Sequence, residues 1–186
     1  MTRRPRVLRL LRFALLASFA VLLLPARNAP ADAARKLFPE FELKTLDGER
    51  LSSRDLRGKV VLLDFWGTWC LPCVTAVPSL SNLSRDMKAE PFVLVSIAVE
   101  EDDGPVRQFV KRNKMDWPQV WDRNAAFARK SGVSRFPTYI LLSHDGDFLH
   151  TVIGSSRGIE KDLRTRVAKA VEAAKNASPP AGEMTR

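Results

Sequence analysis

Two cysteines, Cys70 and Cys73, are the residues of this sequence best placed to do chemistry. They follow an apolar segment and open a predicted helix, within the nine residues FWGTWCLPC at positions 65–73. A helix N-terminus stabilises an anion through its free N–H groups and its dipole, so we expect the pKa of the Cys70 thiol to fall below about 8.5. Cys73 lies one helical turn later, where it can close a small disulfide with Cys70. Cys70 can then attack a disulfide of another molecule, and Cys73 can resolve the mixed disulfide.

A static structural disulfide and a zinc half-site are the alternatives for this pair. A tetrahedral zinc site needs four ligands. Besides the two cysteines, the chain offers only His144 and His150, which fall in a predicted turn and a predicted strand. The strand-to-helix position of the cysteines favours redox chemistry over both alternatives. We therefore predict no metal site and no cofactor beyond the redox-active Cys70–Cys73 disulfide.

The segments around the cysteines predict an α/β domain. Residues 60–66 are almost continuously apolar, as a strand covered on both faces requires, and 71–87 has the pattern of a helix bent at Pro78. Further strands are predicted at 92–99, 138–142 and 148–153, and further helices at 104–114, 124–131 and 158–174. Apolar and polar residues alternate over 41–46, and a turn follows at 47–48, which predicts a β-hairpin before these strands and helices. We expect a mixed central sheet flanked by helices, with an N-terminal β-hairpin extension.

The charge is concentrated at the N-terminus. The formal net charge is +9, but six arginines and no acidic residue precede Asp32, and the rest of the chain carries 24 basic and 21 acidic residues. A basic start, an uncharged apolar run at 13–24 and the small residues at 29–31 match a secretory signal. We predict a signal peptide or signal anchor at 1–31, with 13–24 as a possible membrane tether, and no nucleic-acid partner.

The rest of the chain is predicted to hold one domain, at 38–175. An Ala-, Pro- and Arg-rich linker at 32–37 precedes it, and the segment 176–186, which lacks an apolar period, is predicted to be a disordered tail. The acidic run at 100–103 is predicted to be a solvated loop.

Several motifs resemble those of thioredoxin-like proteins of the TlpA/ResA branch, which are exported or membrane-anchored. They are VLLDFWGTWCLPC at 61–73, LSSRDLRGKVV at 51–61, FPTY at 136–139 and the Asp145-Gly146 turn, and the resemblance spans roughly residues 37–172. It implies a thioredoxin fold and a thiol–disulfide oxidoreductase.

The resemblance also implies roles for single residues. Pro137 matches the cis-proline that faces the cysteine pair and lets the backbone at Phe136 bind an incoming substrate strand, although the residues alone would allow a trans proline. Asp64 matches the buried acid that helps to move the proton of the second cysteine, whereas an ion pair with Lys59 or another base is the alternative. Trp69 is predicted to line the docking surface rather than to serve in packing alone.

One position departs from the branch's pattern. The helix after the cysteines usually carries a glutamate two residues before its proline, and this chain has Ala76 there. The departure weakens the case for cytochrome maturation and places more of the proton transfer on Asp64.

The predicted function is reduction of disulfides in exported cysteine-containing proteins, for example in cytochrome c or copper-site maturation. The location would be periplasmic or otherwise extracytoplasmic, and a membrane thiol carrier would donate the electrons. A disulfide oxidant and a copper-binding assembly factor are the alternatives.

Overall fold

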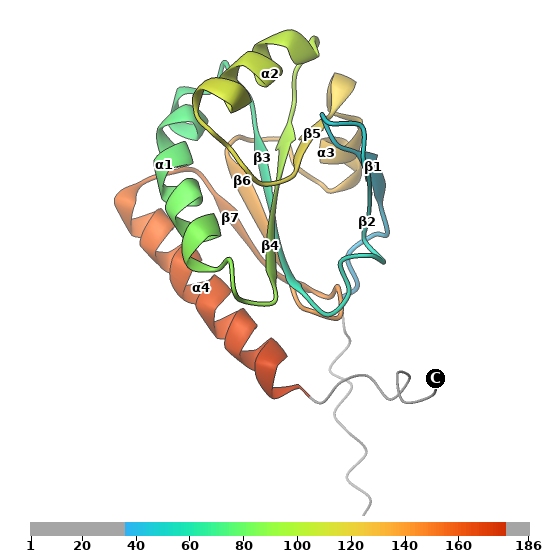
Figure 1. The fold of residues 1–186 in the computed structure, drawn as a ribbon, viewed down its shortest axis with the longest axis vertical. Helices are drawn as coiled ribbons and strands as arrows, with labels where there is room; N and C mark the ends of the chain where they lie inside the picture. Colours follow the sequence, from blue (N-terminus) through green and yellow to red (C-terminus); the bar gives the residue numbers. More distant parts are fainter. Residues whose placement is uncertain (1–35, 178–186) are drawn as a thin grey trace, which may run out of the picture. The chain divides into compact units, whose positions relative to one another are not determined.

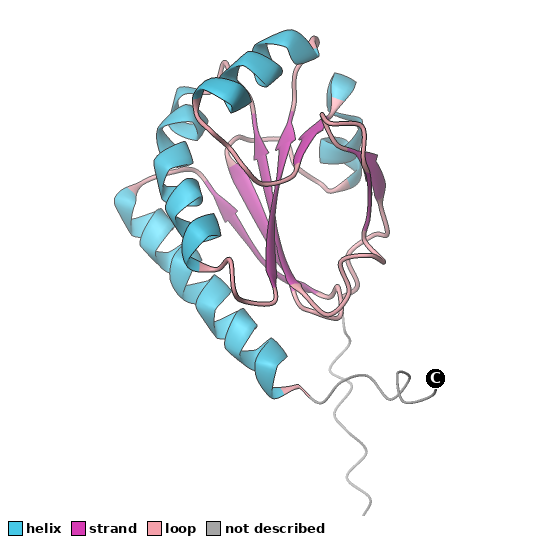
Figure 2. Cartoon of the chain, in the orientation of Figure 1, coloured by secondary structure: helices cyan, strands magenta, loops and turns pink. Residues whose placement is uncertain are grey.

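A five-stranded mixed sheet forms the centre of the computed structural model, which describes residues 36–177 (Figures 1 and 2). The strand order is β5-β4-β3-β6-β7. The parallel pairs are β3–β4 and β4–β5, and the antiparallel pairs are β3–β6 and β6–β7. The strands are β3 (Val60–Trp66), β4 (Phe92–Ala98), β5 (Gln119–Trp121), β6 (Thr138–Leu142) and β7 (Phe148–Ile153). The predicted mixed sheet is confirmed, and every residue of its central strand, β3, is buried.

The N-terminal extension is the predicted hairpin. Strands β1 (Glu42–Lys44) and β2 (Arg50–Ser52) pair antiparallel, and Gly48 in the turn between them has a φ of 89°, which glycine adopts without strain. The chain contacts the domain before this hairpin, because the Phe148 N–H donates to the Lys36 carbonyl at 2.8 Å. The end of the predicted linker therefore packs against the sheet rather than standing apart from it.

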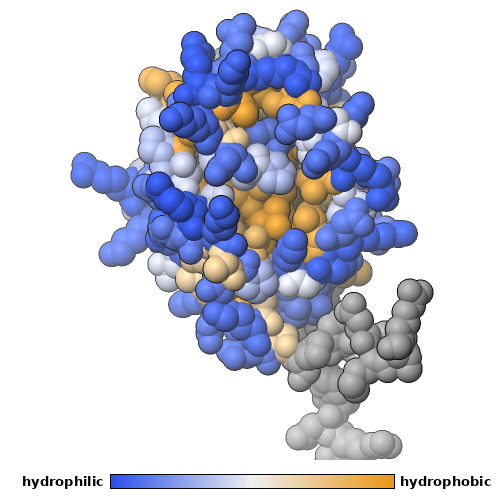
Figure 3. Space-filling view, viewed as in Figure 1, coloured by the Kyte–Doolittle hydropathy of each residue, from blue (hydrophilic) through white to orange (hydrophobic). Residues whose placement is uncertain are grey.

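Two layers cover the sheet. The helices are α1 (Leu71–Asp86), α2 (Asp103–Arg112), α3 (Ala126–Lys130) and α4 (Arg157–Asn176). One face of the sheet packs on α1, α2 and α4, and the other packs on α3 and the hairpin, as the clusters of buried side chains and the ribbon in Figure 1 show. Charged and polar residues cover most of the surface seen in Figure 3, and hydrophobic residues show through near its middle.

Two predicted elements differ from the structure. The strand β5 was not predicted, because only three residues after Pro118 pair with β4, too short a run to show a period. The predicted helix at 124–131 is shorter and irregular, because Asn124 and Ala125 have φ values of 59° and 53° within the 3₁₀ turn (Arg123–Ala125) that directly precedes α3. The helix α1 continues through Pro78 as one 16-residue element.

Three predictions concern residues outside the described range. The signal peptide or anchor at 1–31 and the apolar run at 13–24 fall there, as do residues 178–186 of the tail predicted at 176–186. The tail prediction is wrong for Asn176, which is the last residue of α4. Within residues 36–177, no helix is both long enough and apolar enough to cross a bilayer.

Candidate active site

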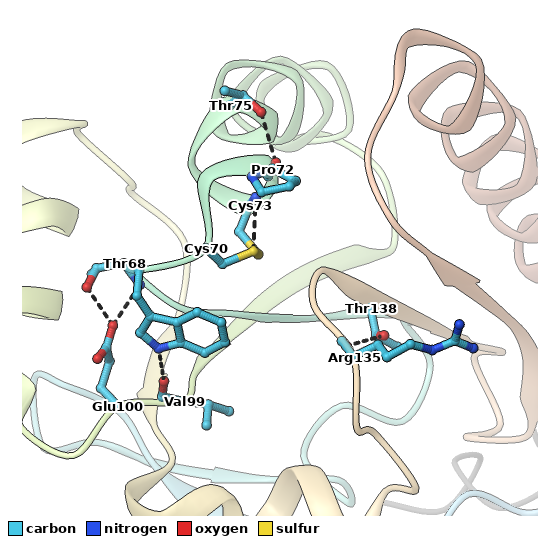
Figure 4. The surroundings of a disulfide bond; sticks show 10 residues. Thr68, Cys70, Pro72, Cys73, Thr75, Val99, Glu100, Arg135 and Thr138 are labelled. Atoms are coloured by element: carbon cyan, nitrogen blue, oxygen red, sulfur yellow. Dashed lines mark hydrogen bonds between the residues drawn. A yellow bond between two sulfur atoms is a disulfide. The ribbon is translucent and has the colours of Figure 1, made fainter.

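The two cysteines form a disulfide at the start of α1 (Figure 4). Cys70 is the N-cap residue, with extended backbone angles, and its Sγ accepts a hydrogen bond from the Cys73 N–H at 3.3 Å. Pro72 lies in the first turn, where a missing N–H breaks no helical hydrogen bond. The Cys70 sulfur therefore already receives the N–H donor that would stabilise it as a thiolate.

The segment ahead of the disulfide is fixed by Glu100, which follows β4. A carboxylate oxygen of Glu100 accepts hydrogen bonds from the Thr68 N–H at 2.7 Å and the Thr68 hydroxyl at 2.6 Å (Figure 4), and its carbonyl accepts one from Trp121 Nε1. The prediction that the run 100–103 is a solvated loop is therefore wrong for Glu100, which is half-buried, although Glu101 and Asp102 are exposed. Sequence reasoning missed this contact because its partners are 32 residues apart.

Trp69 forms one wall beside the disulfide. Its Nε1 donates to the Val99 carbonyl at 3.1 Å, and its ring packs edge-on against Phe136, with centroids 5.4 Å apart. The side chain nevertheless stays 60% exposed, and the neighbouring Leu71 is 72% exposed. Within the described residues, these two are among the few large apolar side chains that face solvent, and both adjoin Cys70 in the chain.

The turn before β6 faces this wall and contains the cis peptide bond Phe136–Pro137, which confirms the predicted isomer. The Pro137 carbonyl accepts from the Gly154 N–H, and the Arg135 carbonyl accepts from the Thr138 hydroxyl (Figure 4). In the described part of the chain, no hydrogen bond uses the backbone N–H or C=O of Phe136. Those two groups can therefore bind the backbone of an extended peptide.

Asp64 is buried in the middle of β3, with 2% of its surface exposed. Side chains alternate across a strand, so Asp64 faces the same side of the sheet as Leu62 and Trp66, the side packed on α1 and Cys73. Burial raises the pKa of its carboxyl from 3.8 to about 7, and a hydrogen bond from Ser96 opposes that rise. No basic residue contributes to this shift, so the predicted alternative, an ion pair with Lys59 or another base, is wrong.

Ser96 and Trp117 complete the surroundings of Asp64, and sequence reasoning missed both. The Ser96 hydroxyl lies 2.7 Å from Asp64 Oδ2, and Trp117 Nε1 lies 2.9 Å from the Ser96 hydroxyl oxygen. Ser96 sits directly beside Asp64 in the β3–β4 register. The sequence does show one polar residue in each of two apolar, predicted strands, Asp64 and Ser96. Only the strand register shows that these two residues lie side by side.

Ala76 lies one turn after Cys73 and lines a cavity of about 250 Å³ between α1 and α4. Tyr139 and Glu160 also line it, and the Glu160 carboxylate accepts a hydrogen bond from Ser79 on α1. Burial, and then the charges of Asp64 and Glu160, raise the pKa of the Tyr139 hydroxyl. The carboxylate at this cavity therefore comes from α4, whereas α1 has alanine at the position where the branch usually has glutamate.

The histidines lie apart from these residues in the fold. His144 is in the turn between β6 and β7, 3.5 Å from Asp145, and His150 is in β7. Across residues 36–177, no group of three or more histidine, cysteine, aspartate or glutamate side chains could hold a metal ion.

Comparisons with known proteins agree with this geometry. The sequence profile of the Redoxin family matches residues 33–167. The chain belongs to the redoxin family. A thiol–disulfide oxidoreductase ResA of Bacillus thuringiensis (strain Al Hakam) is 32% identical over 116 residues, which are 62% of this chain and 67% of that relative.

Solved structures of the same kind share the fold. The thiol:disulfide interchange protein of the thioredoxin family from Chlorobium tepidum has a TM-score of 0.67 at 26% identity, covering 76% of this chain and 99% of that one. A secreted disulfide oxidoreductase of Mycobacterium tuberculosis, homologous to DsbE of E. coli, has a TM-score of 0.61 at 27% identity, covering 69% and 95%. This redoxin is thus a thioredoxin-like thiol–disulfide oxidoreductase of the ResA type, with Cys70 and Cys73 as its redox pair.

Proposed function

We propose that this redoxin reduces disulfide bonds of exported cysteine-containing proteins outside the cytoplasmic membrane. The observation that carries the proposal is the disulfide at the N-terminus of α1, beside a cis-proline turn whose Phe136 backbone groups have no partner within the described residues. A peptide that pairs with Phe136 would lie against Trp69, next to Cys70.

The reaction starts from the dithiol form. The Cys70 thiolate attacks one sulfur of the substrate disulfide, forming a mixed disulfide and releasing the other substrate sulfur as a thiolate. Asp64 then takes the proton of the Cys73 thiol, directly or through a water molecule. The Cys73 thiolate attacks Cys70 Sγ, which restores the Cys70–Cys73 disulfide and releases the second substrate thiolate. Two electrons pass from the enzyme to the substrate, and the proton remains on Asp64.

Asp64 suits the role of proton acceptor because its pKa is raised to about 7, close to the pH at which it works. A carboxylate with an ordinary pKa would hold a proton too weakly to take one from a thiol. The side chains that bury Asp64 lie on the α1 side of the sheet, and Cys73 lies on that side too. The proposal therefore assigns Asp64 to the resolving cysteine and the helix N-terminus to the attacking one.

The extracytoplasmic location and the partners are further parts of this proposal. Residues 1–31 have the pattern of an export signal or anchor, and the M. tuberculosis relative is described as secreted and homologous to DsbE. We propose a membrane thiol carrier as the electron donor and exported proteins such as apocytochrome c or copper-site proteins as substrates. Fusion of residues 1–35 to a reporter enzyme that is active only after export tests the location: an inactive fusion would contradict it.

Trapping of the mixed disulfide tests the order of the cysteines. The variant Cys73→Ser should accumulate a covalent adduct with a peptide cyclised through a Cys-x-x-Cys-His disulfide, since its Cys70 can attack but nothing resolves the product. The matched variant Cys70→Ser should give far less adduct, because Cys73 lacks the N-cap position that stabilises a thiolate. Equal trapping by both variants, or trapping only by Cys70→Ser, would show that the roles are assigned wrongly.

A further inference from the structure

A buried row of polar groups connects three separate elements beneath α1. Trp117, in the segment between α2 and β5, points its Nε1 at the hydroxyl of Ser96 on β4, and this hydroxyl reaches Asp64 on β3. Ser96 is 0% exposed and Trp117 is 6% exposed. No water is needed to explain the arrangement, because each donor in the row meets an acceptor within 2.9 Å.

The direction of each hydrogen bond follows from the chemistry of the groups. An indole N–H only donates, so Trp117 uses a lone pair of the Ser96 oxygen and keeps the single Ser96 proton away from that side. The Ser96 proton can therefore point at Asp64, and the hydroxyl donates to Asp64 Oδ2. Such a bond stabilises the carboxylate form of Asp64 against the burial that disfavours it.

This row of hydrogen bonds makes the two carboxylate oxygens of Asp64 different from each other. Ser96 occupies Oδ2, and none of the hydrogen bonds of the described residues uses Oδ1. A proton that arrives on Oδ1 meets no competing donor, whereas one on Oδ2 would share that oxygen with the Ser96 hydrogen bond and weaken it. Oδ1 is thus the oxygen suited to accept the proton of the Cys73 thiol.

We propose that Ser96, held in place by Trp117, is a positioning residue that sets how readily Asp64 takes a proton and reserves Oδ1 for it. This inference rests on the proposed function, in which Asp64 serves the resolving step. In that step the Cys73 S–H bond breaks, an O–H bond forms on Asp64, and the Cys73 sulfur displaces the substrate sulfur from Cys70.

Few other ionisable groups face Asp64. Tyr139 lies directly opposite it on β6, and its hydroxyl stays protonated because burial raises its pKa. From α1 the facing groups are the two cysteines, and from α4 the carboxylate of Glu160 acts on Tyr139. No lysine or arginine is among the causes of the Asp64 shift, so Ser96 is the main favourable partner of the carboxylate.

The test follows the Asp64 carboxyl carbon by ¹³C NMR during a pH titration of the full-length disulfide form, in which neither cysteine titrates. The wild-type midpoint should lie near 7. Ser96→Ala should raise it by about one to two pH units, since a hydrogen bond to a charged group is lost. Ser96→Thr keeps the hydroxyl and should restore the wild-type midpoint. Trp117→Phe keeps a ring but loses the N–H, and should give an intermediate value.

The possible outcomes distinguish a change in the proton affinity of Asp64 from a general loss of stability. An unchanged midpoint in Ser96→Ala, or equal shifts in the alanine and threonine variants, would overturn the inference, even if both variants were less stable. The pH midpoint of the single-turnover resolving rate should move upward with the titration in Ser96→Ala. If Asp64→Asn resolved the mixed disulfide as fast as wild type, the proposed role of Asp64 would fail, while the titration result for Ser96 would stand.

Discussion

Replacement of Asp64 by asparagine should stabilise the protein at neutral pH while slowing its chemistry. The folded-state pKa of Asp64 is raised from 3.8 to about 7, so the folded protein binds the proton more tightly than the unfolded chain does. The stability that this proton provides is fully present below about pH 3.8 and is lost as the pH rises toward 7. Asparagine resembles the protonated form at every pH and therefore avoids this loss.

The size of the effect follows from the two pKa values. A difference of about three units corresponds to about 4 kcal/mol at 1.36 kcal/mol per unit. The variant should gain little at pH 4, about 2 kcal/mol at pH 5 and about 4 kcal/mol at pH 8, relative to wild type. Asparagine keeps an oxygen that can accept the Ser96 hydrogen bond, so that contact should not offset the gain.

Urea denaturation of the disulfide forms at several pH values between 4 and 8 measures this difference. Asp116→Asn, at an exposed aspartate, is the matched control and should show no comparable gain with pH. A difference between Asp64→Asn and wild type that stays constant from pH 4 to 8 would refute the reasoning. In the dithiol form, the same variant should resolve mixed disulfides about a hundredfold or more slowly, the usual effect of losing a general base.

Two further predictions concern the segment ahead of the disulfide. Gly67→Ala would place a Cβ atom 2.6 Å from Trp69 Nε1, so the ring should move and kcat/KM for a disulfide peptide should fall; an unchanged ring position in a crystal structure would contradict this. Glu100→Ala removes the acceptor of both Thr68 hydrogen bonds, and the Thr68 amide should exchange its hydrogen about tenfold faster or more, whereas Glu101→Ala should leave it unchanged. Equal exchange in the two variants would show that Glu100 does not fix this segment.

The sequence was sufficient to predict the parts of the fold in which a local pattern is strong. The apolar run of β3 is found at the predicted residues 60–66, and the helix predicted at 71–87 is found at Leu71–Asp86. The strand β5 escaped prediction because its three residues become a strand only through pairing with β4. Local propensity carries no information about such a short edge strand.

The site shows the same division. The cysteine motif and its helix cap are local features, and the sequence predicted them, whereas the cis state of Pro137 followed only from the resemblance to a family. The partner of Asp64 could not be predicted, since Ser96 is 32 residues away and meets it only through the sheet register. Glu100 was misinterpreted for the same reason, because its partner is equally distant in the chain.

The equilibrium reduction potential of the Cys70–Cys73 pair tests the central claim most directly. The domain from Asp32 onward would be equilibrated with a thiol redox buffer, and the disulfide fraction measured. A reductant that depends on a dedicated electron donor should have a potential at or below about −250 mV, near that of thioredoxin. A potential near about −120 mV would mark a disulfide oxidant and contradict the proposed direction of electron flow, while leaving the fold and the cysteine pair as described.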